Sequence, residues 1–413
     1  MRIGLVSAEY PPETDFGGLG SYTYKLAHAL SALGHSVTVV SSTAKGKIIG
    51  PFNDGPVTVY RVPMPRRYLA GLGRSINNVE YSFRVYRLLK LLSRGQKIDV
   101  IQFPEYRGEG LIHCLLGRTP YVIRISTPRW LVDELNQRPA HLHPGPRTRI
   151  NRAIDLWVEN MPVRRGRAVI FPSKDIMNLM KRRVGLRGLC RVIYPGVDSD
   201  RFKPGPDPDL RLKSGVGGKP VVLYVGRLEF RKGVHILAQA AVEIVRRIPD
   251  VRFVFAGADS QSAPGGGSMR EYMEKVADRD GIREAFRFIG SVKHQDVARI
   301  YGLGDVLVVP SLYENLANVL LEGMAAGLPI VTTTGGGSPE VVIHGTNGLV
   351  VPPRDPNALA EAVSNILSDS KTREQFALNN RKKALEDLSL ERMARQSVEV
   401  YDTLLKESHA GGD

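Results

Sequence analysis

Residues 219–234 read KPVVLYVGRLEFRKGV, and they carry the clearest indication of the fold class. An almost continuously apolar run predicts a strand over Val221–Gly226, and helical periodicity predicts a helix over Val234–Arg247. A strand that is apolar at nearly every position is buried on both faces, which is typical of a parallel sheet covered by helices. The stretch therefore predicts a strand–turn–helix unit of a doubly wound α/β domain.

The same alternation extends in both directions along the 413-residue chain. Further strands are predicted at Ile3–Ser7, Val37–Ser41, Val57–Val62, Asp99–Phe103, Tyr121–Ile125, Ala168–Pro172, Arg191–Tyr194, Arg252–Ala256, Phe286–Ile289, Val306–Pro310, Pro329–Thr333 and Gly348–Val351. Helical periodicity appears between them, at Tyr22–Leu33, Asn77–Arg94, Val319–Ala326, Pro356–Leu367 and Leu390–Leu405. The pattern predicts two doubly wound, Rossmann-like α/β domains in series.

A proline-rich segment separates the two series. Residues 194–208 read YPGVDSDRFKPGPDP and contain four prolines in fifteen residues, a composition that interrupts regular structure. The expected domains are residues 1–200 and residues 201–389, followed by a helix within residues 390–413. Asp198-Ser-Asp200 and Asp207-Pro-Asp209 lie in this segment rather than after an apolar strand, so they do not indicate a metal site.

Composition narrows the class of protein. Apolar residues make up 42% and charged residues 24% of the chain, which is ordinary for a soluble globular protein. No apolar run approaches the roughly 18 residues that a membrane-spanning helix needs. The two cysteines, Cys114 and Cys190, are too few for a disulfide framework or a metal-ligand cluster, so the sequence favours the reducing cytoplasm.

The net charge of +15 comes from the first half of the chain. Residues 1–200 hold 30 Lys and Arg against 15 Asp and Glu, whereas residues 201–413 hold 27 of each. This asymmetry indicates an acidic substrate or an anionic membrane face as partner, or else a solvated basic surface without a partner. Nucleic acid is disfavoured, because no helix-turn-helix, zinc-finger or aromatic ribonucleoprotein motif is present. The predicted helix Asn77–Arg94 is basic and amphipathic, and it can lie on a membrane or pack on the core.

A glycine-rich turn follows the first predicted strand. Residues 16–22 read FGGLGSY, and Gly17 and Gly18 remove side chains where the chain turns tightly before a helix. The N–H groups of such a helix start suit a phosphate, although a glycine turn alone is weak evidence. The segment lacks the G-x-G-x-x-G spacing of a dinucleotide site, and no ribose-binding acid follows the next strand, so an NAD-dependent enzyme is disfavoured.

Two further segments place charged side chains after predicted strands. Arg227 and Lys232 lie five residues apart in the turn of the opening stretch, so both cations can reach one point and neutralise a diphosphate. Glu314 and Glu322 lie eight residues apart in PSLYENLANVLLEGMAAGLP, residues 310–329. Their carboxylates can accept hydrogen bonds from sugar hydroxyls, and the helix start between them can hold a phosphate. The alternatives are ordinary surface cations, an acid that complements the helix dipole and a surface glutamate.

Together these segments resemble glycosyltransferase family 4, the retaining transferases with the two-domain GT-B fold. The ordered set comprises Tyr10-Pro-Pro with Gly-Gly-Leu-Gly-Ser-Tyr, Leu33-Gly-His-Ser-Val-Thr-Val, Tyr194-Pro-Gly-Val-Asp, Gly226-Arg-Leu with Lys232-Gly, the two glutamates eight residues apart and Thr334-Gly-Gly-Gly-Ser-Pro-Glu. The resemblance covers essentially the whole chain. It implies two Rossmann-like domains whose parallel sheets face each other across a cleft. It also implies an acceptor in the first domain, a nucleotide sugar in the second, and a last helix that packs back on the first.

The resemblance also implies roles for individual residues. Arg227 and Lys232 match the pair that binds the donor diphosphate. Glu322 matches the acid that holds the ribose, and Glu314 matches the acid near the donor sugar, where it can steady positive charge at the anomeric carbon. The remaining donor-binding positions are the backbone of Asn318, Val319 and Leu320 at the helix start, Gly17 and Gly18 in the first domain, and Val292 in a loop expected to select the base.

One position departs from the family pattern. Many members have a histidine facing the donor sugar after the strand predicted here at Tyr121–Ile125, whereas this chain has Ser126. A serine can donate a hydrogen bond but cannot carry the charge of an imidazole. Arg124, two residues earlier, is an alternative source of positive charge. Ser126 is nevertheless included among the expected catalytic residues, with Arg227, Lys232 and Glu314.

The expected function is retaining transfer of a sugar from a nucleotide diphosphate sugar to an acceptor hydroxyl, in glycan, glycolipid or glycosylated-metabolite biosynthesis. No cofactor or metal is implied. The acceptor stays open, with lipid-linked and anionic compounds as candidates, and the expected location is the cytoplasm or the inner membrane face. The alternatives are a nucleotide-sugar epimerase, a glycan phosphorylase, and a non-catalytic protein that binds a nucleotide sugar or an anionic polymer. The phosphorylase is disfavoured because no pyridoxal-phosphate lysine site is identifiable.

Overall fold

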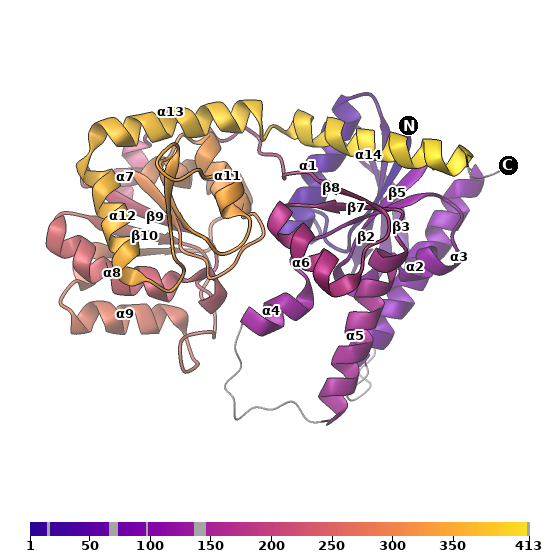
Figure 1. The fold of residues 1–413 in the computed structure, drawn as a ribbon, viewed down its shortest axis with the longest axis horizontal. Helices are drawn as coiled ribbons and strands as arrows, with labels where there is room; N and C mark the ends of the chain where they lie inside the picture. The colour runs from indigo at the N-terminus through magenta and orange to yellow at the C-terminus, as the bar shows by residue number, and fades with distance from the viewer. Residues whose placement is uncertain (15–16, 66–72, 96–97, 136–145, 411–413) are drawn as a thin grey trace. The chain divides into compact units, whose positions relative to one another are not determined.

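The computed structural model describes residues 1–14, 17–65, 73–95, 98–135 and 146–410, which form two compact units. The first unit contains the described residues of Met1–Glu134, Arg138–Gly196 and Leu390–Asp413. The second contains Leu135 and Val197–Ser389. The chain passes from one unit to the other within the proline-rich segment identified in the sequence. Each unit has its own sheet and its own hydrophobic core (Figure 1).

An eight-stranded sheet forms the centre of the first unit, in the order β3-β4-β2-β1-β5-β6-β7-β8. Neighbouring strands run parallel, except that the edge strand β3 is antiparallel to β4. The strands are β1 (Arg2–Val6), β2 (Ser36–Thr43), β3 (Ile49–Asp54), β4 (Val57–Pro63), β5 (Val100–Pro104), β6 (Tyr121–Arg124), β7 (Ala168–Phe171) and β8 (Leu189–Val192). The central strands are buried along almost their whole length, as their apolar sequences predict.

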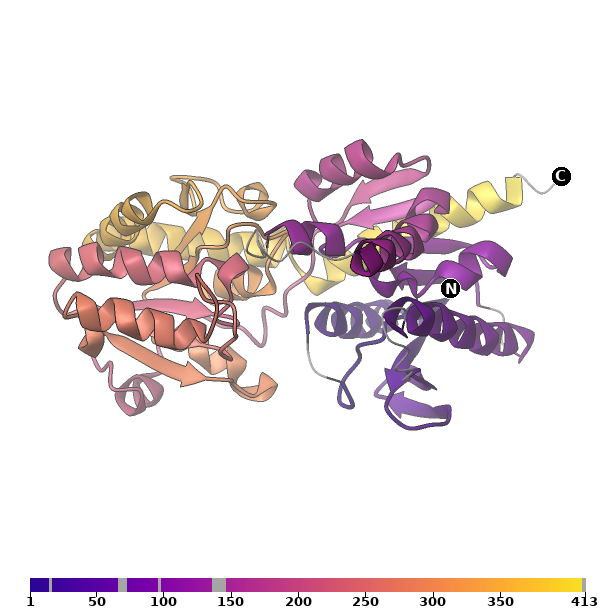
Figure 2. The ribbon, with the colours of Figure 1, turned by 90° about the horizontal axis from the view of Figure 1, so that it is seen from below.

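Helices cover both faces of this sheet (Figures 1 and 2). One face packs against the helices α1 (Gly18–Ala32) and α14 (Leu390–Ala410). The helices α2 (Gly73–Gly95), α3 (Leu111–Leu116) and α5 (Pro146–Arg165) pack on one another and cover the other face. Two more described helices of this unit are α4 (Arg129–Leu135) and α6 (Lys174–Val184).

The C-terminal helix α14 is an integral part of the first unit. Met393, Val400 and Leu404 join the apolar core on the α1 side of the sheet. The hydroxyl of Tyr401 donates a hydrogen bond of 2.8 Å to the side-chain oxygen of Gln102 on β5, and both side chains are buried. A buried polar pair of this kind fixes the helix in one position, because shifting it would leave both groups without partners.

The second unit is built around a six-stranded sheet in the order β11-β10-β9-β12-β13-β14, in which every neighbouring pair is parallel. Its strands are β9 (Val221–Val225), β10 (Arg252–Ala256), β11 (Phe286–Gly290), β12 (Val306–Val309), β13 (Ile330–Thr333) and β14 (Gly348–Val351). Its helices are α7 (Pro208–Lys213), α8 (Val234–Arg247), α9 (Met269–Arg279), α10 (Val297–Ile300), α11 (Asn318–Ala325), α12 (Pro356–Ser368) and α13 (Ser370–Glu386). Helices α8, α9 and α12 supply one apolar layer, and α11 packs with α13.

Local sequence signals explain where two of these helices lie. The Asp355 side chain accepts a hydrogen bond of 2.9 Å from the N–H of Ala358, and Pro356 occupies the first helical position of α12. Gly323 allows α11 to approach β12, because a Cβ there would lie 2.2 Å from a methyl carbon of Leu307. This close packing holds the second half of α11 directly against β12.

The predicted fold class is confirmed, since both units are α/β structures with parallel sheets. The sequence missed β3, because residues 49–54 include Gly50 and Pro51 and lack regular apolar alternation. A proline is tolerated there because β3 is an edge strand. Strand β8 begins and ends two residues earlier than predicted, since it pairs with β7 from Leu189 to Val192 and leaves the sheet before Pro195. No helix in the described part of the chain has the length and hydropathy needed to cross a membrane.

Candidate functional site

Two glycines shape the turn that follows β9. Gly226 has φ of +140° and Gly233 has φ of +68°, conformations that side chains rarely adopt. A Cβ at Gly233 would lie 1.9 Å from the carbonyl oxygen of Pro310, at the end of β12. In addition, the N–H of Leu312 donates a hydrogen bond of 2.9 Å to the carbonyl of Arg231. The loops after β9 and β12 are therefore packed backbone to backbone.

A chain of alternating charges joins these two loops. The guanidinium of Arg227 lies 3.1 Å from the Glu229 carboxylate, and the guanidinium of Arg231 lies 3.8 Å from the same carboxylate. Arg231 also forms an ion pair of 3.0 Å with Glu314, to which Lys232 is paired as well. This ion-pair network contains three cations and two carboxylates, so it carries an excess positive charge that favours a nearby anion. The structure thus brings the predicted residues Arg227, Lys232 and Glu314 into one network.

Burial varies along the ion-pair network. The side chain of Arg227 is 65% exposed, whereas Arg231 and Glu314 are both buried. Burial alone would raise the pKa of Glu314, but the charges of Lys232 and Arg231 outweigh it and lower that pKa to about 2. Glu314 is therefore a permanent negative charge at neutral pH, while Arg227 stands at the solvent-facing end.

The backbone of Glu314 is fixed by the glycine-rich loop after β13. The N–H of Glu314 donates to the carbonyl of Gly335 at 3.1 Å, and the N–H of Gly337 donates back to the carbonyl of Glu314 at 3.0 Å. Gly336 has φ of +95°, and a Cβ there would lie 2.1 Å from the Glu314 carbonyl oxygen. The loop predicted as Thr334-Gly-Gly-Gly thus holds Glu314 in place through its backbone.

Helix α11 carries the second predicted carboxylate. Glu322 accepts a hydrogen bond of 2.8 Å from the hydroxyl of Tyr301, which also lies 3.4 Å from the carbonyl of Val319. The helix begins at Asn318, and the N–H of Leu320 bonds within the first turn. The amide groups of Asn318 and Val319 therefore stand at the positive end of the helix dipole, where a phosphate is favoured.

Val292 lies at the edge of the second unit's sheet. It is half-buried in the loop that follows β11, the strand at one end of the sheet order. Two residues further along, the ring Nε2 of His294 lies 2.6 Å from a guanidinium nitrogen of Arg201. This loop is therefore tied to the start of the second unit rather than to β9 and β12, which carry the ion-pair network.

The glycines predicted in the first unit lie at the start of α1. Gly17 is the N-cap residue, and a Cβ there would lie 2.6 Å from a carboxylate oxygen of Glu9. Gly18 is the first helical residue, is exposed, and has open space around its Cβ position. The Glu9 carboxylate is the end of a flexible side chain and can move away from Gly17, whereas Gly18 keeps the backbone of the helix start accessible.

Ser126 is held by a buried glutamate. Its hydroxyl donates a hydrogen bond of 2.6 Å to Glu105, and its N–H donates one of 2.7 Å to the other oxygen of the same carboxyl. Burial raises the pKa of Glu105, against the opposing effect of these two hydrogen bonds. Arg124 is also buried, with its guanidinium 4.3 Å from the centre of the Tyr22 ring and a hydrogen bond to the carbonyl of Ile125. Its charge is thus engaged within the first unit.

Sequence reasoning missed the buried carboxyl groups of the first unit, which are Glu105, Asp155, Glu159 and Glu109. Glu109 accepts the N–H of Ala8 at 3.0 Å and 3.1 Å. The sequence could have indicated Glu105 as a site residue, because it directly follows the predicted strand at β5, at the carboxyl edge of a parallel sheet. Among the described residues, no group of three or more His, Cys, Asp or Glu side chains could hold a metal ion.

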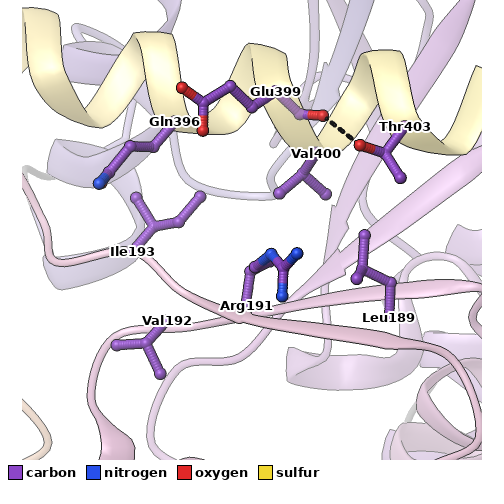
Figure 3. Close-up of a pocket in the computed structure, with 8 residues that line it drawn as sticks. All are labelled: Leu189, Arg191, Val192, Ile193, Gln396, Glu399, Val400 and Thr403. Atoms are coloured by element: carbon purple, nitrogen blue, oxygen red, sulfur yellow. Dashed lines mark hydrogen bonds between the residues drawn. The ribbon is translucent and has the colours of Figure 1, made fainter.

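A small hollow lies between the edge strand β8 and helix α14 (Figure 3). Its volume is about 190 Å³, and its lining includes Arg191, Val192, Gln396 and Glu399. Figure 3 also shows that the hydroxyl of Thr403 donates a hydrogen bond to the backbone carbonyl of Glu399, one turn earlier in α14. None of the predicted site residues lines this hollow.

Comparison of the chain with models of protein families identifies its family. Residues 208–383 match the model for group 1 glycosyl transferases, and residues 16–201 match the model for glycosyltransferase family 4. Together the two matches cover most of both units. The chain belongs to glycosyltransferase family 4.

Relatives of this family 4 glycosyltransferase span its whole length. An uncharacterised glycosyltransferase of Methanocaldococcus jannaschii is 28% identical over 97% of this chain and 98% of its own. The solved structure of sucrose-phosphate synthase from Thermosynechococcus elongatus superimposes with a TM-score of 0.80 at 24% identity, covering 98% and 99% of the two chains. HepE of Anabaena, solved in complex with UDP, gives a TM-score of 0.70 at 20% identity, covering 98% and 100%. These structures establish the GT-B fold.

The buried carboxyl groups give this glycosyltransferase a testable pH dependence. Burial raises the pKa of Glu109 to about 8, as it does for Glu159. An unfolded glutamate ionises near pH 4.3, so between roughly pH 4.3 and about pH 8 the folded chain binds more protons than the unfolded chain. The free energy of unfolding of the first unit should therefore fall as pH rises through this window.

The measurement is thermal unfolding followed by tryptophan fluorescence at pH 6 and pH 9. Both tryptophans, Trp130 and Trp157, lie in the first unit, so the signal reports that unit. Glu109→Gln should reduce the loss of stability between the two pH values, whereas Glu391→Gln, on the surface of α14, should leave it unchanged. A Glu109→Gln variant with the wild-type pH dependence would contradict the assignment.

Proposed function

We propose that this chain is a retaining glycosyltransferase that moves a sugar from a nucleoside diphosphate sugar to an acceptor hydroxyl. The observation that carries the proposal is the ion-pair network of the second unit, with its excess positive charge and its exposed Arg227. A diphosphate is the anion that such a converging set of cations suits. HepE, which shares the fold, has been solved with UDP and with UDP-glucose, and this supports a donor of the same class.

In the proposed reaction, the main barrier is charge that develops on the leaving diphosphate. Lys232 and Arg227 neutralise that charge, and the amide groups at the start of α11 add to the same effect. The packed loops after β9 and β12 fix the backbone that carries these groups, so the backbone needs little reorganisation during the reaction. The proposal requires no metal ion, since side-chain cations take that role.

Glu314 acts in this proposal as a fixed negative charge. With a pKa of about 2 it holds no proton to donate at neutral pH, and it is too weak a base to accept one from a hydroxyl. It instead stabilises positive charge at the anomeric carbon of the donor sugar. The acceptor proton passes to the leaving phosphate on the same face of the sugar, which retains the configuration and requires no side-chain base.

The first unit is proposed to hold the acceptor, with Gly18 and Ser126 among the residues that contact substrate. Because the Ser126 hydroxyl donates its proton to Glu105, the Ser126 oxygen is oriented to accept a hydrogen bond from a sugar hydroxyl. Glu105 thereby acts as a positioning residue for Ser126. The basic character of residues 1–200 favours an acceptor that is anionic or is presented at an anionic surface.

Nucleotide titration tests the division of roles between the two carboxylates. Calorimetry with uridine, guanosine and adenosine diphosphates identifies the base, and the matching nucleotide sugar is then compared with the diphosphate. Glu322→Gln should weaken binding of both ligands roughly 10- to 100-fold, because it removes a charged acceptor for the ribose hydroxyls. Glu314→Gln should mainly remove the extra affinity that the sugar contributes.

Tyr301→Phe is the matched control for Glu322. It keeps the carboxylate but removes the hydrogen bond that orients it, so the loss of nucleotide affinity should be smaller than for Glu322→Gln. Equal losses for both ligands in the Glu314 and Glu322 variants would contradict the division of roles. If none of the three diphosphates binds the wild-type chain, the proposed donor class is wrong.

A further inference from the structure

A layer of three helices in the first unit exposes unusually many large apolar side chains. Helices α2, α3 and α5 pack on one another over one face of the sheet (Figure 1), so their outer surfaces point away from that sheet. These helices expose at least 40% of each of six large apolar side chains, namely Phe83, Leu91, Leu115, Leu116, Ile150 and Trp157. Exposed large apolar side chains on three helices that pack on one another indicate a binding surface rather than ordinary scatter.

The exposed charges on the same three helices are all positive. Their sequences contain only three carboxylates, of which Asp155 and Glu159 are buried and Glu80 is paired with Arg84 at 2.5 Å. The exposed cations are Arg87, Lys90, Arg94, Arg152, Arg164 and Arg165, of which Arg152 lies 3.5 Å from the carboxylate of Asp133 on α4. We call the six apolar side chains and these cations the α2–α3–α5 surface.

Direct contacts join the apolar and cationic groups of this surface. The hydroxyl of Tyr86 on α2 donates a hydrogen bond of 3.3 Å to the carbonyl of Leu116, at the end of α3. The ammonium of Lys90 lies 5.9 Å from the centre of the same Tyr86 ring. Leu116 and Lys90 are therefore neighbours across two helices. On α2, Phe83, Arg87 and Lys90 recur at helical spacing on its exposed side.

We propose that the α2–α3–α5 surface binds the face of an anionic lipid bilayer. A bilayer offers anionic headgroups above an apolar interior, so it satisfies the cations and the exposed Trp, Phe and Leu side chains together. A soluble polyanion would satisfy only the cations. Aromatic and leucine side chains beside Lys and Arg are the usual composition of helices that lie in the bilayer interface.

Helix α13 of the second unit provides a contrast within the same chain. It also exposes large apolar side chains, Leu378 and Leu385, but its cations alternate with Glu374 and Glu386. Exposed leucines alone therefore do not distinguish the α2–α3–α5 surface. The distinction is that its exposed charges are of one sign.

Tryptophan fluorescence gives a direct reading of the proposed contact. The chain contains two tryptophans, of which Trp130 is 2% exposed and Trp157 is 54% exposed. Adding vesicles of phosphatidylcholine mixed with phosphatidylglycerol should shift the emission of Trp157 to the blue, and brominated lipids should quench it. Vesicles of phosphatidylcholine alone should produce neither change. Donor and acceptor are absent, so the result does not depend on the proposed transferase activity.

Co-sedimentation with the same vesicles measures the strength of binding. Arg87→Gln with Lys90→Gln should weaken partitioning about 30-fold at low salt, since each cation near an anionic surface contributes about fivefold. Higher salt should weaken the wild type in the same way, because the attraction fades over a Debye length of about 8 Å at physiological ionic strength. Trp157→Ser should also weaken binding, and it should abolish the lipid-dependent change in emission.

The matched control removes the same charge from α13. Lys371→Gln with Lys382→Gln should leave vesicle binding at the wild-type level. The proposal is overturned by an absence of binding to anionic vesicles, by equal binding to both vesicle types, or by equal effects of the two double variants. It is also overturned if light scattering shows a dimer without lipid that Trp157→Ser dissociates, because the surface would then belong to a second copy of the chain.

Discussion

Lys232→Ala should lower the turnover number by about 100- to 1,000-fold, the usual loss when one group that stabilises a developing negative charge is removed. Lys232 is the cation that shares the buried carboxylate of Glu314 with Arg231, and its side chain remains 22% exposed. It is therefore the member of the ion-pair network that can leave Glu314 and contact a phosphate. The loss should appear in the turnover number with saturating donor, because the charge to be stabilised develops in the transition state.

Lys219→Ala is the matched control for this variant. Lys219 lies just before β9, is 43% exposed, and approaches Asp250 only to 3.9 Å, so its removal should leave turnover unchanged. Arg227→Ala should act in the same direction as Lys232→Ala, because Arg227 is the exposed end of the network. Near-normal rates in both the Lys232 and the Arg227 variants would remove the central argument for the proposed function.

The fold could be predicted from the sequence where a strand is a continuous apolar run and glycines mark the turn that follows it. The strands β9, β10 and β14 could be predicted because each is an apolar run. Gly226 and Gly233 lie in the turn after β9, and both have the positive φ that favours glycine. Strand β3 was not readable, because an edge strand needs neither continuous burial nor a full set of amide donors.

Only those residues of the candidate site that lie in recognisable sequence motifs could be predicted. Arg227, Lys232 and Glu314 were identified by spacing and resemblance, but Arg231 was not. Its role depends on a contact with Glu314, 83 positions away along the chain. Ser126 was identified as a departure from a pattern, yet its partner Glu105 directly follows the neighbouring strand β5. Pairings across neighbouring strands follow from sheet order, which composition and periodicity do not give.

The stability of the second unit should depend on Arg231 more than on any exposed arginine. Arg231 and Glu314 are both buried, and removing one member of a buried pair leaves an uncompensated charge, at a cost of about 3 to 5 kcal/mol. We expect Arg231→Met to fall near the lower end of this range, because Lys232 still pairs with Glu314. Arg246→Met is the matched control, since it breaks an Arg–Glu pair with Glu243 in which the arginine is 77% exposed, and it should cost less than about 1 kcal/mol.

Hydrogen exchange in peptides that contain β12 is the suitable measurement, because both tryptophans lie in the first unit and fluorescence would not report the second. Adding Glu314→Gln to Arg231→Met should recover part of the lost stability, since the double variant no longer buries a carboxylate that has lost one of its two cations. If the two changes simply add, or if Arg231→Met costs no more than Arg246→Met, the buried pair does not hold the loops together. Glu314 would then owe its position to the backbone bonds with Gly335 and Gly337 alone.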